Sequence, residues 1–227
     1  YGTSFMSGVN DKTIWGEKFV HVVSCNTHGS AALMRTFGGE KLENLRSADM
    51  VVVRRSEDIG NHQRLVTANV VARHLDPDAG THHSVDVIDL FKTLGVHTKM
   101  TSSSDITTPS QLMHAVRFNI ELKHELKHDI EDLIASYPLI ATTKKFDSNV
   151  VFEMGRRYGF NGRLFSHAII IAENLLITKD RIKGWAFVPQ EGNSIISTLH
   201  AFLLQTKHNE ESKLIKKIIR DLCRDQW

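Results

Sequence analysis

The chain has 227 residues, of which 41% are hydrophobic and 24% are charged, and its 28 Lys and Arg nearly balance its 26 Asp and Glu. These values are typical of a soluble globular protein and exclude a disordered, collagen-like or low-complexity chain. The formal charge of +2 lacks the basic excess of nucleic-acid binders, so we expect no nucleic-acid partner. No apolar run approaches the roughly 18 residues that cross a membrane, so we expect no membrane partner.

The cysteine content indicates the redox state of the compartment in which the protein is found. Cys25 and Cys223 are the two cysteines of the chain, and no secretory signal pattern opens the sequence. Isolated thiols without such a signal favour a reducing compartment, and we expect a cytoplasmic protein. The chain starts at Tyr1 rather than at Met, and we expect a processed form or a fragment.

Hydrophobic patterning predicts strands and helices that alternate along the chain. The expected strands are residues 19–23, 50–53, 85–88, 98–101, 118–123 and 139–142, with two or three more within 167–185. The expected helices begin at residue 26, near 126, at 149, at 194 and at 211, and the segments 56–84 and 101–110 are expected to be polar loops. Interspersed strands and helices with hairpin-like joins favour an α+β fold with a mixed sheet.

Glycine motifs that bind nucleotides are missing. No G-x-G-x-x-G follows a predicted strand, and Gly38-Gly39 comes after a predicted helix, which is the wrong context. We therefore expect residues 1–227 to form one domain without a nucleotide-binding domain of its own.

Cys25 lies where a predicted strand meets the start of a predicted helix. Free N–H groups and the positive dipole of a helix start stabilise a thiolate, so this position predicts a lowered pKa for a reactive cysteine. The alternative is a buried structural cysteine, which is the commoner fate of a lone thiol. Cys223 falls in a basic C-terminal helix and is interpreted as an ordinary helix residue.

Five segments in order resemble the archaeal-type (type II) glyceraldehyde-3-phosphate dehydrogenases. They are Val22-Val23-Ser24-Cys25-Asn26-Thr27, Val51-Val52-Val53-Arg54-Arg55, His82-His83-Ser84-Val85-Asp86-Val87, Pro109-Ser110-Gln111-Leu112-Met113-His114 and Val188-Pro189-Gln190-Glu191. The resemblance covers most of the chain and implies the catalytic domain of that family, with its N-terminal Rossmann domain absent. It also implies a largely antiparallel sheet with helices packed on one face.

The resemblance implies a covalent mechanism. Cys25 would attack the aldehyde carbon, the hemithioacetal would pass a hydride to a nicotinamide, and inorganic phosphate would cleave the thioester. His114 matches the general base, and an imidazole suits that role near neutral pH. Without the resemblance, His114 would be interpreted as a packed histidine.

The remaining site residues also follow from the resemblance. Substrate and phosphate contacts would come from Ser24, Asn26, Arg54, Arg55, His82 and His83, and cofactor contacts from Arg55 and Gln190. Arginine suits phosphate binding because its planar guanidinium can donate two parallel N–H hydrogen bonds to the phosphate oxygens. Of the two arginines Arg55 is the better match, although one of the pair is expected to be solvated. The polar loop with His82 and His83 is alternatively a simple solvated loop.

The implied partners are a phosphorylated aldehyde, inorganic phosphate, and NAD or NADP held mainly by the missing domain. Family members are tetramers, so a homo-oligomer is expected. The chain departs from the family at His28, Ser84, Val85 and Pro189, and His28 adds an imidazole that either pairs with the thiolate or crowds it. Two alternatives stay open. The protein acts on a different phosphorylated aldehyde, or it is a degenerate relative that serves as a binding or assembly module.

One motif competes with this interpretation. His124-Glu125-Leu126-Lys127-His128 matches the H-E-x-x-H of zinc hydrolases, which requires a helix that presents both histidines on one face. If the segment is helical, both histidines lie opposite its apolar side and face water. No third ligand motif follows, so no metal site is predicted and a zinc hydrolase is a minor alternative.

Overall fold

The computed structural model describes residues 2–56, 68–97, 99–110, 112–126 and 129–227. The strands are β1 (Thr3–Phe5), β2 (Val20–Val22), β3 (Leu45–Arg54), β4 (Val70–Val71), β5 (Thr101–Thr107), β6 (His114–Leu122), β7 (Ile140–Thr143), β8 (Ala168–Ile171), β9 (Leu176–Ile177) and β10 (Arg181–Val188). The α-helices are α1 (Cys25–Gly38), α2 (His82–Lys92), α3 (Ile130–Ala135), α4 (Ser148–Arg157), α5 (Ile195–Gln205) and α6 (Glu211–Leu222).

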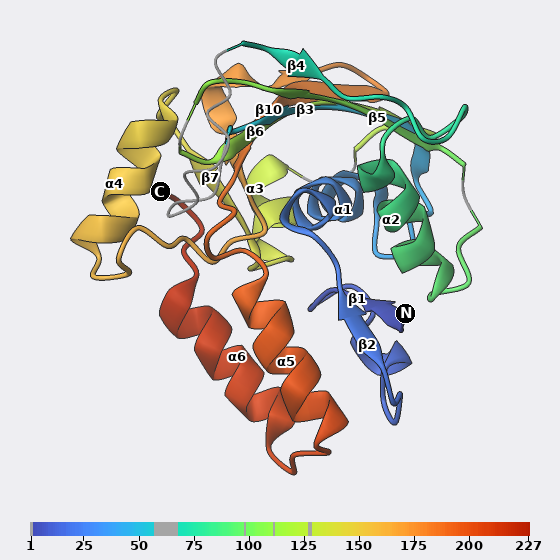
Figure 1. The fold of residues 1–227 in the computed structure, drawn as a ribbon, viewed down its shortest axis with the longest axis vertical. Helices are drawn as coiled ribbons and strands as arrows, with labels where there is room; N and C mark the ends of the chain where they lie inside the picture. The colour runs from blue at the N-terminus through green and yellow to red at the C-terminus, as the bar shows by residue number, and fades with distance from the viewer. Residues whose placement is uncertain (1, 57–67, 98, 111, 127–128) are drawn as a thin grey trace.

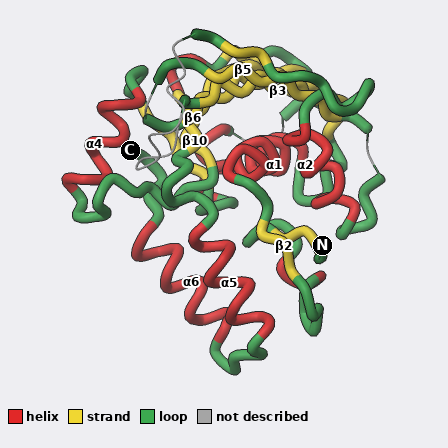
Figure 2. The backbone as a smooth tube through the Cα atoms, in the orientation of Figure 1, coloured by secondary structure: helices red, strands yellow, loops and turns green. Residues whose placement is uncertain are grey.

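One open sheet organises these elements. Its strands follow the order β4-β5-β3-β6-β10-β8-β7, and β9 pairs with β10. The pairs β3–β5 and β7–β8 are parallel, and the other pairs of this sheet are antiparallel. Helices α1, α2 and α3 lie on one side of the sheet, and α5 and α6 form a hairpin that extends away from it (Figure 1; Figure 2). The predicted α+β fold with a largely antiparallel sheet is confirmed.

The core lies between this sheet and α1. Alternate residues of β6 are buried, among them Val116, Phe118 and Ile120, so one face of the strand is apolar as the period of two requires. Phe118 stacks on Phe37 of α1, with ring centroids 5.9 Å apart. This contact holds α1 against the centre of the sheet.

The structure corrects two expectations between residues 81 and 110. Residues 85–88 belong to α2 rather than to a strand, and the segment predicted as a loop from 101 contains β5. The inward residues of β5 include Thr101, Ser103 and Asp105, all buried and all polar, so no apolar alternation marks the strand. The Ser103 hydroxyl lies 2.7 Å from the Thr81 hydroxyl and accepts the Ser84 N–H at 3.2 Å, which ties β5 to the start of α2.

Other boundaries also shift. The strand expected at 98–101 begins only at Thr101. In the segment 56–84, residues 57–67 lie outside the described residues, and the part expected to be a loop contains β4 and the first turn of α2.

The helix expected around the H-E-x-x-H segment starts later. Helix α3 begins at Ile130, whereas His124 lies in the bend that follows β6, and His128 lies outside the described residues. Asn44 fixes this bend by accepting the His124 N–H at 2.9 Å and donating to its carbonyl at 3.0 Å. The expectation of a helix is wrong for the described part of the motif, residues 124–126, which lack the helical frame that a zinc hydrolase requires.

Helix α1 packs closely on the end of β10 at Gly29. A Cβ at this position would lie 2.6 Å from Val188 Cγ2. Gly29→Ala should therefore lower the free energy of unfolding by about 1–3 kcal/mol through overpacking, although alanine normally favours a helix. The double variant with Val188→Ala should regain part of this loss in urea denaturation. An increase in stability from the single variant would show that α1 can move away from β10.

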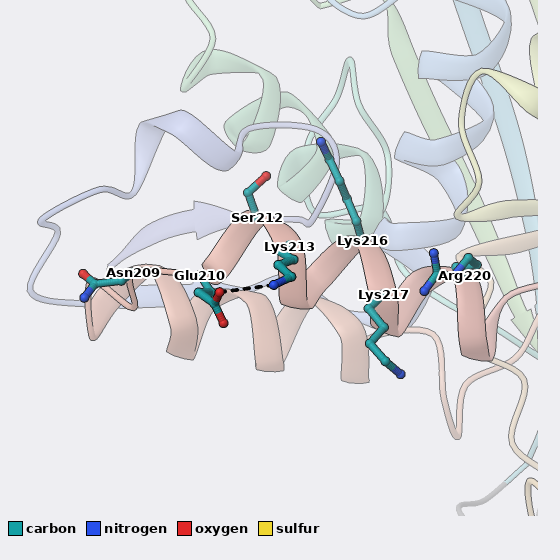
Figure 3. Close-up of a pocket in the computed structure, with 7 residues that line it drawn as sticks. All are labelled: Asn209, Glu210, Ser212, Lys213, Lys216, Lys217 and Arg220. Carbon is teal, nitrogen blue, oxygen red and sulfur yellow. Dashed lines mark hydrogen bonds and ion pairs between the residues drawn. The ribbon is translucent and has the colours of Figure 1, made fainter.

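The α5–α6 hairpin carries a basic surface. A hollow of about 680 Å³ is lined by Lys213, Lys216, Lys217, Arg220 and three polar neighbours, and the long side chains point in different directions in Figure 3. Ile215 of the same helix is buried. No described helix is both long enough and apolar enough to cross a membrane.

Candidate functional site

Several chain segments meet at one edge of the sheet. Strands β3 and β5 end there, and β6 begins there, with Val53 opposite Ala115 and Arg54 opposite Thr107. Strand β10 also ends there, where Val188 is opposite His114. Parallel and antiparallel pairing thus brings together residues that lie far apart in the sequence.

Asn193 ties the start of α1 to the same edge. Its side-chain N–H group donates to the Cys25 carbonyl at 2.9 Å and to the His167 carbonyl, just before β8, at 3.2 Å. Sequence analysis missed Asn193, because a single Asn after Gln-Glu-Gly carries no recognisable signal. Asn193 fixes the position of the cysteine backbone, although it lies 168 residues from Cys25 and 26 residues from His167 in the sequence.

Cys25 is the first residue of α1. Ser24 is the N-cap, and its hydroxyl accepts the Thr27 N–H at 3.4 Å. Burial raises the pKa of the Cys25 thiol to about 11, although N–H groups at the helix start and the charges of Arg54 and Arg55 oppose this. The predicted lowered pKa is wrong for this structure, because loss of hydration outweighs the helix start and both cations.

His114 opens β6 and is buried. Its Nδ1 accepts the backbone N–H of Arg55 at 3.0 Å, so the neutral ring carries its proton on Nε2. Burial and the nearby charges of Arg55 and Arg54 lower the pKa of His114 to about 3. The ring is therefore a neutral Nε2–H donor near pH 7. The described structure records no hydrogen bond between His114 and the Cys25 thiol, but both side chains experience the charges of Arg54 and Arg55.

Arg55 links β3 to the segment after β10. It is 5% exposed, its Nε donates to Gln190 Oε1 at 2.6 Å, and its Nη1 lies 2.8 Å from Glu191 Oε1. With the backbone bond to His114, Arg55 thus contacts two other predicted site residues, Gln190 and His114, which lie in separate segments of the chain. Glu191 was not predicted as a site residue, although it adjoins Gln190 in the segment that carried the resemblance. Charge pairing of this kind fixes the guanidinium in place.

Arg54 has a different environment. Its side chain is 41% exposed and its Nη1 lies 3.5 Å from Asp105 Oδ2, whose side chain is 1% exposed. The sequence assigned the stronger phosphate role to Arg55, but Arg54 is the arginine that reaches solvent. Burial raises the pKa of Asp105, but the contact with His83 and the charge of Arg54 outweigh it, so the pKa lies below its usual value.

Asp105 joins the predicted histidines. Its Oδ2 lies 3.2 Å from His83 Nε2, and the rings of His82 and His83 lie 3.9 Å apart between centroids. Asn26 Nδ2 lies 3.5 Å from the same His83 nitrogen. Asp105 is a site residue that sequence analysis missed, because it follows three serines in a segment interpreted as a loop. The structure thus brings Asn26, His82 and His83 into one cluster, while their roles stay predictions.

His28 faces away from this cluster. It is fully buried, its Nδ1–H donates to the Ser24 carbonyl at 2.9 Å, and its Nε2 accepts from the Ser197 hydroxyl at 2.8 Å. Its ring lies edge-on to His167, with centroids 4.8 Å apart. His28 therefore neither pairs with the thiolate nor crowds it. Its hydrogen bond to the carbonyl of Ser24 instead stabilises the N-cap of α1.

Three buried histidines should make the fold sensitive to acid. Burial lowers the pKa of His28 to about 4, that of His114 to about 3, and that of His167 well below its usual value. Because the unfolded chain binds these protons near pH 6.5, stability is complete above that pH and is lost as the pH falls below it. Each histidine should remove about 1.4 kcal/mol per pH unit between pH 6 and 4.5. Urea denaturation at several pH values measures this slope.

A matched pair of variants tests whether His28 is buried in its neutral form and contributes to this pH dependence. His28→Gln should reduce the slope by about one histidine, whereas His208→Gln, at an exposed position, should leave it unchanged. A slope that is the same in both variants would contradict the buried, neutral state of His28.

A hollow beside Arg55 is a candidate for the reactive end of a cofactor. It measures about 490 Å³ and is lined by Arg55, Gln190, Glu191, Phe152 and residues 161–163. An aromatic ring with polar side chains around it suits a planar amide-bearing ring. The described residues contain no glycine-rich turn between a strand and a helix that would hold a pyrophosphate.

Comparisons with known proteins find chains of similar sequence. No protein-family model matches the chain. Curated proteins named glyceraldehyde-3-phosphate dehydrogenase are similar to it: that of Methanoregula boonei is 24% identical over 97% of this chain and 63% of its own length. That of Saccharolobus solfataricus is 26% identical over 90% of this chain and 59% of its own length. That of Saccharolobus islandicus is 30% identical over 66% of this chain and 42% of its own length.

The chain spans about half the length of the curated relatives that it matches. The matches include nearly all of this chain, and therefore the edge of the sheet where Cys25, His114 and the two arginines lie. The chain is accordingly a homologue of the archaeal glyceraldehyde-3-phosphate dehydrogenases, matched by part of their length.

Proposed function

We propose that the chain is the catalytic domain of an enzyme that oxidises glyceraldehyde 3-phosphate, or a related phosphorylated aldehyde, with phosphate as the second substrate. The supporting observation is the position of Cys25. It stands at the start of α1, at the same sheet edge as a neutral imidazole donor and two arginines. A nucleophile, an oxyanion donor and anion-binding groups in one place are the requirements of phosphorylating acyl chemistry.

The thiol reacts after it loses its proton to solvent. Its Sγ bonds to the aldehyde carbon, and the electron pair of the C=O bond moves to the oxygen. His114 Nε2–H donates to that alkoxide, which suits the protonation state that its Nδ1 contact imposes. C=O would then re-form on the hemithioacetal carbon, its hydrogen leaving as hydride for the nicotinamide of a bound cofactor, and a thioester would remain on Cys25. A phosphate oxygen then attacks, the C–S bond breaks, and an acyl phosphate departs from the restored thiolate.

This assignment refines the role of His114. Sequence analysis predicted a general base, and that role stays a prediction. Burial and the neighbouring guanidinium groups disfavour the imidazolium, with a pKa of about 3, so the ring stabilises charge on oxygen better than it accepts a proton.

Phosphate recognition divides between the two arginines. Arg54, half exposed, and His82, at the rim of the cluster, would bind the phosphates of the substrates. Arg55 is held by Gln190 and Glu191 and would position them while contributing its charge. Ser24 and Asn26 flank the thiol, and the helix N–H groups beside it would support the oxyanion.

The cofactor would be NAD or NADP. When bound, its nicotinamide accepts the hydride. Gln190 and Arg55 would border that ring in the hollow of about 490 Å³, and a nucleotide-binding domain outside these residues would hold most of the cofactor. We place the enzyme in the cytoplasm, and we include assembly into a homo-oligomer, a tetramer by the resemblance, in the same proposal.

Substrate protection tests the proposed substrate class. Iodoacetamide at alkaline pH should alkylate Cys25, and glyceraldehyde 3-phosphate should slow this reaction at least about tenfold more than unphosphorylated glyceraldehyde does. Two charge-assisted contacts to phosphate supply that difference. Site-resolved peptide mass spectrometry follows Cys25, with Cys223 as the internal control. Equal protection by both aldehydes would contradict recognition of the phosphate.

A second candidate is a non-catalytic relative that serves as a binding or assembly module. The raised pKa of Cys25 favours it, because a protonated thiol is a poor nucleophile near pH 7. Covalent acylation of Cys25 separates the two candidates.

A further inference from the structure

The cluster of His82, His83 and Asp105 has the composition of a metal site. One ligand atom from each residue lies within 4.8 Å of the others. Two imidazoles and one carboxylate form a ligand set that suits divalent transition metals, with the remaining coordination positions left to solvent. Sequence analysis predicted no metal ligands, because Asp105 lies more than 20 residues after the histidines and in a presumed loop.

The spacing of two of these atoms already suits a metal ion. His83 Nε2 and Asp105 Oδ2 lie 3.2 Å apart. Two ligands bound to zinc at tetrahedral angles are separated by about 3.3 Å, given bond lengths of roughly 2.0–2.1 Å. The two side chains are 3% and 1% exposed, so the surrounding structure holds them in place. His82 reaches the surface, and one of its ring nitrogens lies within 4.8 Å of the ligand atoms of the other two residues.

Several buried polar atoms in the cluster lack hydrogen-bond partners and could serve a cation. Among the described residues, both Asp105 oxygens, His83 Nδ1 and Asn26 Oδ1 are buried and have no hydrogen-bond partner. Within the described part of the chain, the Asp105 carboxylate makes ion-pair contacts of 3.2 Å to His83 and 3.5 Å to Arg54. These contacts keep Asp105 ionised, and a bound cation would in addition provide a partner for the carboxylate oxygens that accept no hydrogen bond.

The positive charge of Arg54 beside Asp105 does not prevent a cation from binding there. Among the described residues, Arg54 is the arginine that contacts Asp105, and its half-exposed side chain can turn into solvent. At the start of α2, the Ser84 N–H already donates to the Ser103 hydroxyl and lies 3.3 Å from the Thr81 carbonyl. These contacts weaken the positive electrostatic potential of the helix N-terminus, which would otherwise oppose a cation.

We propose that His82, His83 and Asp105 bind one divalent transition-metal ion of the zinc class. The proposal goes beyond the aldehyde-oxidising function and does not require it. Because His82 and His83 are also assigned to substrate phosphate, a bound ion would occupy the same place, and such metals should act as inhibitors that compete with the phosphorylated substrate.

Cobalt provides a test that does not depend on activity. Chelator-treated protein titrated with Co²⁺ should develop visible d–d absorption that saturates at one ion per chain, and Zn²⁺ should displace it. Asp105→Asn and His82→Gln should each weaken Co²⁺ binding more than about tenfold. Because His82 is half exposed, its substitution should leave the fold intact, as circular dichroism would verify.

Three control variants identify other binding sites. Cys25→Ser should keep the spectrum, which excludes a thiolate ligand, and His124→Gln and His74→Gln should also keep it. Loss of the spectrum in His124→Gln alone would assign the binding to the H-E-x-x-H segment and overturn the proposal. Binding that survives Asp105→Asn and His82→Gln in folded protein would overturn it as well, whatever the outcome of the aldehyde experiments.

Discussion

Cys25→Ser should abolish transfer of phosphate into an acyl phosphate. In this exchange, an acyl phosphate acylates the thiol and releases phosphate, and radiolabelled phosphate then cleaves the thioester to return labelled acyl phosphate. The half-reaction needs no nicotinamide, so it suits a chain whose described residues lack a dinucleotide cradle. Removing a nucleophile typically costs at least about 10³-fold in rate, and serine is a far weaker nucleophile than a thiolate.

The pH dependence of this exchange follows from the burial of the thiol. Because burial raises the pKa of Cys25 to about 11, the reactive thiolate fraction should rise about tenfold per pH unit from pH 7 to 9. Cys223→Ser is the matched control, since burial also raises the pKa of that thiol, to about 12, and it lies at the end of α6. Exchange that survives in Cys25→Ser, or that disappears in Cys223→Ser, would refute the assignment of the nucleophile.

Phe118→Ala should reduce the free energy of unfolding by about 3–5 kcal/mol. Phe118 is fully buried in the middle of β6, stacks on Phe37, and fills the space above Gly184 of β10. Truncation leaves a cavity between α1 and the sheet. Because domains of this kind are stable by roughly 5–15 kcal/mol, the loss should be visible as a large shift of the urea midpoint.

Phe118→Leu provides the matched comparison. It keeps most of the buried volume and should cost much less than the alanine variant. Similar losses in both variants would show that the stacked ring pair, rather than the filled volume, stabilises this contact. A loss below about 1 kcal/mol in Phe118→Ala would mean that α1 is not packed on the sheet as described.

The elements with strong local signals were predictable from the sequence. Strand β6 alternates apolar and polar residues, and α1 starts directly after the N-cap Ser24. Strand β5 was not predictable, because its buried face is made of Thr101, Ser103 and Asp105. These residues are tolerated inside because they bond to the start of α2, and that long-range contact leaves no trace in the local pattern.

The candidate site was predictable as a set of residues but not as a network. The segments around Cys25, Arg54, His82 and His114 resembled a known family, whereas the sheet pairing decides which of them meet. Asp105, Glu191 and Asn193 enter the site through contacts across 22 to 168 residues of chain. The pKa of Cys25 depends on the balance between burial and charge, which requires the three-dimensional structure.

The central claim is that Cys25 carries the acyl group during catalysis. The most direct measurement is to incubate the protein with the acyl phosphate of 3-phosphoglycerate, quench in acid, and locate the adduct by peptide mass spectrometry. The account predicts a hydroxylamine-labile acyl group on Cys25, none on Cys223, and its removal when inorganic phosphate is added. An unmodified Cys25 in folded protein at pH 9 would contradict the catalytic account and would support a non-catalytic relative.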